Sequence, residues 1–272
     1  MSFRDILRKY RDESFSERDK GTRFERLMRG FLLTEPRYTS QLKDVQMWEN
    51  FFAKDQLGSI DTGIDLVAET VNGEFWAIQC KCYDERSSIS ADEVSKFIAA
   101  SGRSFTDRSG NRTQFALRVW ISTTDHWTVN AENTIIGQTP SVTRINLSDL
   151  DSSAVDWEKL ENGIHGKAAR PPKYDMKVHQ KEAFDSAQKY FETKDRGKLI
   201  MACGTGKTFA SLKIAESRAD KSRSILFLAP SIALVGQTLR EWTSQSENDL
   251  NVLCVCSDPK ASLRNKNEGG GN

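Results

Sequence analysis

A glycine-rich segment, ACGTGKT ending at Thr208, constrains the fold more than any other part of the sequence. A short apolar run precedes it and a helical pattern follows, which predicts a strand, a tight loop and a helix. Gly204 and Gly206 would let backbone N–H groups turn inward around phosphate oxygens. Lys207 would place its charge on the β- and γ-phosphates, and the Thr208 hydroxyl could bind Mg²⁺. The strict pattern begins with glycine, where this sequence has Met201.

The sequence around this loop alternates between predicted helices and predicted strands. Helices are expected over residues 180–191, 207–215 and 232–242, and strands over residues 199–202, 224–229 and 252–256. Strands that alternate with helices are typical of a parallel sheet in an α/β domain. The C-terminal part of the chain is therefore predicted to be a parallel α/β domain.

Three segments of this part resemble motifs of the superfamily two helicases. Gln180 stands where that family reads adenine, ACGTGKT resembles its motif I, and LAPS at residues 228–231 resembles its DNA-contacting motif Ia. The resemblance implies ATP as a ligand, with a RecA-like fold. The family's Asp-Glu box does not appear, so we expect only part of the first RecA-like domain. The residues expected to bind the nucleotide are Gly204, Thr205, Gly206, Lys207, Thr208 and Gln180.

The N-terminal part predicts a β-hairpin, with strands over residues 64–70 and 74–83. A two-residue turn would point Asp65 away from Gln79, because side chains alternate between the two faces of a sheet. A three-residue loop ending at Gly73 would instead place Asp65 opposite Gln79 and diagonal to Lys81. Glycine adopts positive φ without steric cost, so we predict this loop, with Gly73 in the left-handed region.

Asp65, Gln79 and Lys81 form a set suited to phosphodiester hydrolysis. That reaction needs a metal ion beside the scissile phosphate and a water that can be deprotonated. Asp65 is a hard anionic ligand for Mg²⁺, and the Gln79 amide oxygen is a neutral second ligand. Lys81 lies two residues after Gln79, so it shares a strand face and could orient the attacking water.

This set resembles the Mrr-like branch of the PD-(D/E)xK nucleases, in which glutamine replaces the second acid. The resemblance covers roughly residues 20–150 and implies a central mixed sheet flanked by helices. It also implies that Glu25, on a helix with an apolar stripe, is the family's acidic helix residue and a third metal ligand. Each residue has an ordinary alternative: Asp65 could cap a turn, Lys81 could be a solvated strand residue, and Glu25 could be a surface glutamate. Asp61 is interpreted as a turn residue.

Composition limits the remaining possibilities. The 272 residues include 39 basic and 38 acidic side chains, a net charge of +1, so any phosphate-binding surface must be local. The 14 Phe, 6 Trp and 5 Tyr argue against disorder, and the sequence has no apolar run long enough to cross a membrane. We expect a nuclease domain over residues 1–150, a linker over residues 151–173 and a partial RecA-like domain over residues 174–272.

A nuclease followed by the start of a helicase resembles the N-terminus of the type ISP single-chain restriction–modification enzymes. The resemblance implies a bacterial, cytoplasmic, type II-like Mg²⁺-dependent endonuclease acting on double-stranded DNA. It further implies coupling to an ATP-driven translocase, and helicase, methyltransferase and target-recognition modules in a full-length protein. Two alternatives stay open: a non-catalytic module that binds DNA or ATP, and a nuclease-helicase of a different DNA defence system.

Overall fold

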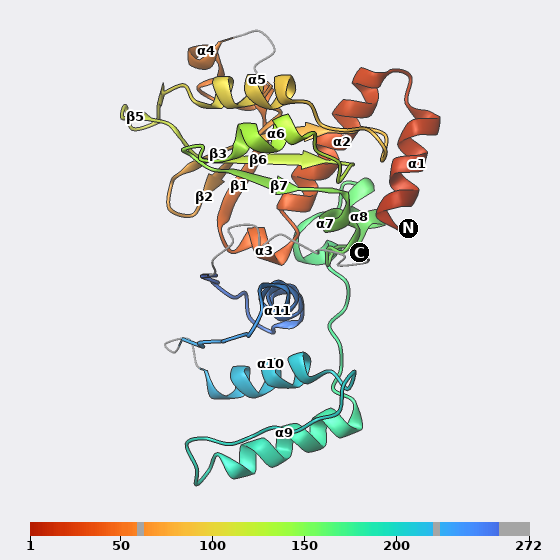
Figure 1. The fold of residues 1–272 in the computed structure, drawn as a ribbon, viewed down its shortest axis with the longest axis vertical. Helices are drawn as coiled ribbons and strands as arrows, with labels where there is room; N and C mark the ends of the chain where they lie inside the picture. Colours follow the sequence, from red (N-terminus) through yellow and green to blue (C-terminus); the bar gives the residue numbers. More distant parts are fainter. Residues whose placement is uncertain (59–62, 220–223, 256–272) are drawn as a thin grey trace. The chain divides into compact units, whose positions relative to one another are not determined.

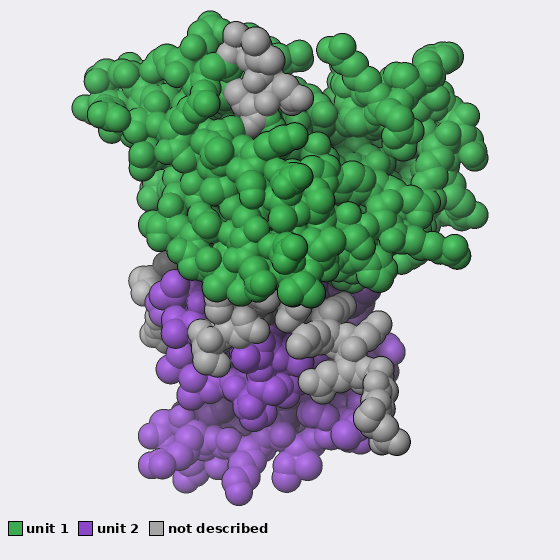
Figure 2. Space-filling model, turned by 45° about the horizontal axis from the view of Figure 1, so that its top comes forward, with its two compact units in different colours: residues 1–170 green, residues 171–272 purple. Residues whose placement is uncertain are grey.

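The computed structural model describes residues 1–58, 63–219 and 224–255. The chain divides into two compact units, Met1–Arg170 and Pro171–Asn272. Figure 2 shows the first unit in green and the second in purple. Each unit is considered by itself below.

The first unit is built on a five-stranded mixed sheet with the order β1-β2-β3-β6-β7 (Figure 1). The first three strands pair in antiparallel fashion, whereas β3, β6 and β7 are parallel. The expected central mixed sheet flanked by helices is therefore confirmed. The strands of this sheet are β1 (Leu42–Met47), β2 (Leu66–Thr70), β3 (Phe75–Lys81), β6 (Phe115–Ser122) and β7 (Val142–Ile145).

Each face of this sheet carries its own hydrophobic core. On one face, Leu66, Ile78 and Cys80 pack with helices α1 and α2 in the first core. On the other face, Val67 and Ala77 pack with α5 and α6 in the second core. Since neighbouring residues of a strand point to opposite faces, odd-numbered positions of β2 and β3 face α5. The helices are α1 (Phe3–Glu13), α2 (Glu17–Leu32), α5 (Ala91–Ser101) and α6 (Val129–Ile135).

Shorter elements complete the first unit. Residues 45–50 form the end of β1 and then a 3-10 turn. Pro36 occupies the first position of α3, where its missing N–H costs nothing. These elements are α3 (Pro36–Thr39), η1 (Trp48–Asn50), α4 (Lys54–Leu57), β4 (Phe105–Thr106) and β5 (Arg112–Thr113).

The hairpin between β2 and β3 has the predicted register. Leu66 pairs with Ile78, and the loop consists of the three residues between Thr70 and Glu74. Thr70 N donates to Glu74 O at 2.8 Å, and Gly73 has φ of +82°. The three-residue loop and the left-handed Gly73 are thus confirmed. Extending the register by one residue places Asp65 opposite Gln79.

The structure differs from the linker expected over residues 151–173. Residues up to Arg170 belong to the first unit, where α7 (Leu147–Asp151), α8 (Trp157–Glu161) and η2 (Gly166–Ala169) follow β7. The Trp157 ring lies between Phe3 and Phe31, with centroid distances of 4.5 and 5.5 Å. The segment looks like a linker because its apolar residues are widely spaced among polar ones. In the structure these apolar side chains are buried and close the first core.

We expect Trp157→Ala to lower the free energy of unfolding by about 3–5 kcal/mol, because it empties a buried aromatic site beside Phe3 and Phe31. Denaturant unfolding of the full chain measures this change. Phe15→Ala is a matched control, because the Phe15 side chain is 94% exposed and its loss leaves no cavity. Equal stability of the two variants would contradict the packing role of Trp157.

The second unit has three helices among its described residues: α9 (Val178–Tyr190), α10 (Lys207–Arg218) and α11 (Ile232–Gln245). The strands expected over residues 199–202 and 224–229 are not formed, and these segments have no ladder partner within the described part. The same holds for residues 252–255; Cys256 lies outside the described residues. A strand needs an aligned neighbour about 4.8 Å away, whereas Ile200 and Leu226 are 90% and 82% exposed here.

Within the described residues, no helix combines the length and apolar character that crossing a membrane requires.

Candidate functional site

Asp65 and Gln79 meet on the α5 side of the sheet, as the register requires. The Gln79 amide nitrogen donates to Asp65 Oδ2, and Cys80 N donates to the same oxygen at 2.6 Å. Gln79 is 4% exposed, so these groups lie at the buried floor of the site. The predicted proximity of the two side chains is confirmed, with the amide nitrogen rather than the amide oxygen toward Asp65. Rotating the amide by 180° would exchange these two atoms.

Gly63 allows the chain to pass close to this pair. Its φ is +65°, and an added Cβ would lie 3.1 Å from Gln79 Oε1 and 3.7 Å from Phe97 Cα. A side chain at this position would therefore press on Gln79, whereas it would make only ordinary contact with the α5 backbone. Glycine is needed both for the backbone conformation and for the close approach.

Lys81 shares the face of Asp65 and Gln79, one strand repeat further along β3. Its side chain is half-buried, and within the described part of the chain its ammonium group makes no hydrogen bond or ion pair. Glu25 reaches the neighbourhood from α2. Burial raises the pKa of Glu25, while the Lys81 charge opposes that rise. The two groups are thus close enough to interact electrostatically, although α2 covers the opposite face of the sheet.

We expect Glu25→Gln to stabilise the protein near pH 7 when no metal ion is present. Because folding raises the pKa of Glu25, stability is greatest while this group is protonated and is lost as pH rises through the folded pKa. The variant should therefore melt at a higher temperature than the wild type at pH 7 and equally at low pH. Thermal unfolding in EDTA across pH measures this, with exposed Glu17→Gln on the same helix as control. A wild-type protein that gains stability relative to the variant as pH rises would contradict the burial of Glu25.

The donor set fits a magnesium ion that keeps most of its water. Mg²⁺ usually binds one or two carboxylates and retains several water ligands. Asp65 supplies a carboxylate, and Gln79 supplies an amide oxygen once its amide is turned. Within the described residues, no group of three or more His, Cys, Asp or Glu side chains is arranged around one point. Asp61 lies outside the described residues.

Two side chains that the sequence did not indicate, Tyr83 and Glu93, also lie beside the site. The Tyr83 hydroxyl donates to Glu93 Oε1, and Glu93 interacts electrostatically with Lys81. Glu93 also closes a capping box with Ser90 at the start of α5. The sequence does contain a signal for Tyr83, because it follows Lys81 by two residues and would share its face on an extended strand.

In the second unit, the expected phosphate loop leads into α10. Gly204 and Gly206 both have positive φ, at +77° and +78°, and Gly206 caps the helix at Lys207. The Lys207 ammonium donates to the carbonyls of Met201 and Ala202 at 3.3 and 3.0 Å. The ammonium group is therefore held against the backbone at the start of the loop. The helix N-terminus and this ammonium group together favour a bound anion.

Gln180 holds the loop from α9 instead of pointing into solvent. Its amide nitrogen donates to Thr205 O at 3.0 Å, and its oxygen accepts from Lys177 N at 2.9 Å. His179 Nε2 lies 3.0 Å from the same Thr205 carbonyl, a contact that the sequence did not indicate. An added Cβ on Gly206 would come within 2.3 Å of the Gln180 amide nitrogen. The loop conformation and the Gln180 position are therefore mutually dependent.

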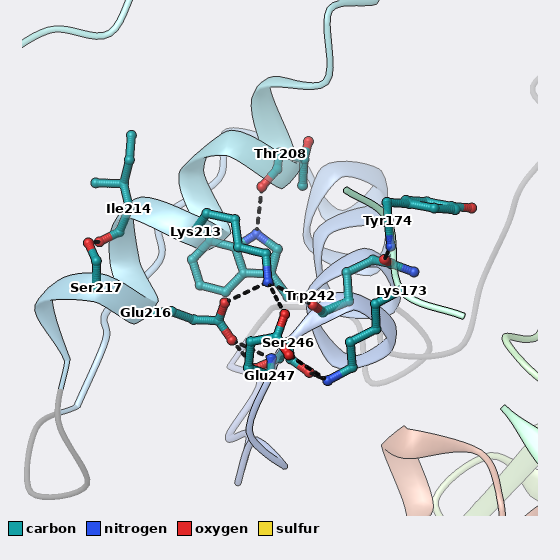
Figure 3. A network of polar contacts seen from close by, with 11 residues as sticks. Lys173, Tyr174, Thr208, Lys213, Ile214, Glu216, Ser217, Trp242, Ser246 and Glu247 are labelled. Carbon is teal, nitrogen blue, oxygen red and sulfur yellow. Dashed lines mark hydrogen bonds and ion pairs between the residues drawn. The ribbon is translucent and has the colours of Figure 1, made fainter. Parts of the chain in front are cut away.

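A polar network fixes α10 in the second unit (Figure 3). Lys213 donates to Glu216 and Glu247 at 3.1 and 2.7 Å, and Glu247 also lies 3.5 Å from Lys173. At the other end of the helix, the Trp242 indole donates to Thr208 O at 3.0 Å. The expected Mg²⁺-binding residue is therefore held from α11.

Comparisons with known proteins match both parts of the chain. A restriction endonuclease family of the Mrr type matches residues 33–167, and the family of type III restriction enzyme res subunits matches residues 173–268. Among solved structures, the ATP-dependent type ISP restriction–modification enzyme LlaBIII bound to DNA is similar, with 32% identity and a TM-score of 0.71 over 91% of this chain. The resemblances expected from the sequence, to an Mrr-like nuclease followed by the start of a helicase and to a type ISP enzyme, are thus confirmed.

This chain spans 15% of the length of the LlaBIII chain. The MspJI restriction endonuclease in complex with a 27-mer oligonucleotide also matches, at 15% identity and a TM-score of 0.33, over 54% of this chain and 30% of that one. No curated protein sequence matches.

Proposed function

Because this chain is an Mrr-type restriction endonuclease domain followed by the start of a helicase-like domain, similar to a type ISP enzyme, we propose that it is a Mg²⁺-dependent DNA endonuclease of a restriction system. The nuclease domain is residues 1–170, and the partial RecA-like domain begins at Pro171. In a full-length protein, the nuclease is coupled to an ATP-driven DNA translocase.

The observation that carries this proposal is the meeting of Asp65 and Gln79 beside Lys81 on one face of the sheet. A hairpin shifted by one residue would have pointed Asp65 to the opposite face, and no shared metal site could form. The buried Gln79 side chain and the close passage of Gly63 hold this arrangement in one geometry.

The residues divide the chemistry between them. Asp65 and the Gln79 amide oxygen would hold Mg²⁺, which when bound polarises the scissile phosphate and lowers the pKa of water. Lys81 orients the attacking water and offsets the negative charge that develops on the phosphate. Glu25 would contribute a further carboxylate to the metal site from α2. Glu25, Asp65, Gln79 and Lys81 are the proposed catalytic set.

The experiment is nicking of supercoiled plasmid by the full chain with Mg²⁺, with EDTA, and across a salt series. We expect weak nicking without sequence preference, lost in EDTA and falling steeply with salt, because few phosphate contacts contribute to binding. DNA binding without nicking in Mg²⁺ would support the non-catalytic alternative and reject the proposal.

We further propose that the second unit binds ATP without hydrolysing it. Gly204, Gly206, Lys207 and Thr208 supply the phosphate cradle, but the described part of this unit contains no acidic pair that could hold Mg²⁺ and position water. An arginine supplied by another domain to the transition state contributes on the order of 10³-fold or more in related enzymes. A phosphate-release assay with DNA should therefore stay at background, and DNA-stimulated hydrolysis by the pure chain would contradict this expectation.

A further inference from the structure

Helix α5 packs on the face of the sheet to which Gln79 and Lys81 belong. At Phe97, the α5 backbone approaches the Gly63 position, which itself lies against Gln79 Oε1. Glu93 precedes Phe97 by four residues, which is one turn of the same helical face. On β3, Lys81 follows Gln79 by one strand repeat. The helix thus presents Glu93 toward the Lys81 end of the site.

Glu93 is fixed in place by three groups. Its Oε2 accepts from Ser90 Oγ at 2.8 Å and from Ser90 N at 3.4 Å, which closes the capping box of α5. Its Oε1 accepts from the Tyr83 hydroxyl. Tyr83 is itself anchored, because Thr123 Oγ1 donates to its backbone carbonyl at 2.7 Å. A carboxylate held in this way cannot follow a moving partner.

This fixed carboxylate remains charged beside Lys81. Although burial opposes ionisation, the hydrogen bonds from Tyr83 and Ser90 and the Lys81 charge keep the pKa of Glu93 below its ordinary value. Glu25, on the other side, has a pKa raised by burial. Lys81 therefore interacts with two carboxylates from different helices, of which Glu93 is the more firmly held and the more readily ionised.

We propose that Glu93, held by Tyr83, is a positioning residue that directs the Lys81 ammonium toward the scissile phosphate. The inference rests on the proposed nuclease function. Lys81 makes no hydrogen bond within the described part of the chain, so its flexible side chain needs an electrostatic guide to spend most of its time over the metal site. Glu93 supplies that guide without binding the metal ion itself.

The test measures single-turnover nicking of supercoiled plasmid by full-chain variants, with Mg²⁺ and DNA titrated separately. We expect Glu93→Gln to lower the rate constant by about 10- to 100-fold, the usual cost of losing a group that orients a catalytic side chain. The half-saturating concentrations of DNA and Mg²⁺ should not change. Tyr83→Phe should lower the rate less, by about 3- to 10-fold, and the double variant should equal Glu93→Gln because Tyr83 acts through Glu93.

Asp5→Asn is the matched control, because Asp5 closes the same kind of capping box on α1, with Ser2. It should lower the melting temperature comparably to Glu93→Gln and leave nicking unchanged. If Glu93→Gln fails to fold, the Tyr83→Phe variant is used for the test instead. That substitution leaves both hydrogen bonds from Ser90 to Glu93 in place.

Unchanged nicking in both variants would overturn the inference. So would a loss accompanied by an equal rise in the half-saturating Mg²⁺ concentration, which would make Glu93 a metal ligand. The wild-type and Asp65→Asn proteins are measured in parallel. Together they distinguish the nuclease function from the positioning role of Glu93. No wild-type nicking rejects the nuclease function, whereas wild-type nicking that Asp65→Asn abolishes and Glu93→Gln preserves rejects only the positioning role.

Discussion

Replacing Asp65 by asparagine is expected to reduce Mg²⁺-dependent plasmid nicking by about 1,000-fold or more. The substitution removes the Asp65 carboxylate at the floor of the site. A metal ion contributes several kcal/mol to the transition state, and each 1.36 kcal/mol is about tenfold in rate. Asparagine keeps an oxygen that can accept from Cys80 N, so the fold is retained. Alanine would leave that N–H group without its partner and cost roughly 1–3 kcal/mol of stability.

Lys81→Ala should lower nicking by about 100- to 1,000-fold, the usual cost of losing one preorganised stabilising group. Asp44→Asn is the control for both variants, since Asp44 is exposed on the neighbouring strand β1. Nicking rates under single-turnover conditions and circular dichroism spectra would be compared for all three proteins. Folded Asp65→Asn protein that cuts at the wild-type rate would show that the chemistry resides elsewhere.

The second large effect is expected at Gly206, where alanine should abolish detectable binding of ATP–Mg²⁺. An added Cβ would come within 2.3 Å of the Gln180 amide nitrogen, so either the loop or α9 must move. Gly204→Ala is an unusually close control, because Gly204 has nearly the same φ but nothing within 4 Å of an added Cβ. Both variants carry the strain of a left-handed alanine, about 1–3 kcal/mol.

The difference between the two variants therefore isolates the contact with Gln180. Saturation-transfer NMR with ATP–Mg²⁺ detects weak binding and suits this comparison. Gly204→Ala is expected to weaken binding by about 5- to 150-fold, the cost of about 1–3 kcal/mol of strain, and to keep it detectable. Equal loss in both variants would mean that strain, and not the packing of Gln180 on the loop, controls the cradle.

The parts of the site that local geometry determines could be predicted from the sequence. Gly73 was sufficient to select the three-residue loop, and the loop in turn fixed Asp65 opposite Gln79. The phosphate loop was predictable for the same reason, since glycines at this spacing allow the positive φ angles that the loop requires. In both places the backbone conformation and the chemistry depend on the same few residues.

Features that depend on distant contacts could not be predicted. Trp157 stands among polar residues, and nothing local shows that its ring fills a site between Phe3 and Phe31. Glu93 is a complete capping residue by itself, so its second hydrogen bond, from Tyr83, adds no sequence signal. The apolar segments near Ile200 and Leu226 show the reverse case, in which a strand pattern is present but none of the described residues pairs with it.

The closure of α8 on α1 has a mechanical consequence. Tyr10 and Lys9 of α1 both bind Glu161, and Phe3 packs on Trp157, so the first helix of the unit is clamped to the last. Tension applied at residue 171 would be resisted first by the hydrogen bonds of Arg170 and Gly166 to Thr34 and Thr39. The contacts between α8 and α1 would resist it next, before load reaches β3. The strand that carries Gln79 and Lys81 is therefore shielded from pulling on the chain that leaves the unit, and we expect the arrangement of these two side chains to persist while that chain is under load.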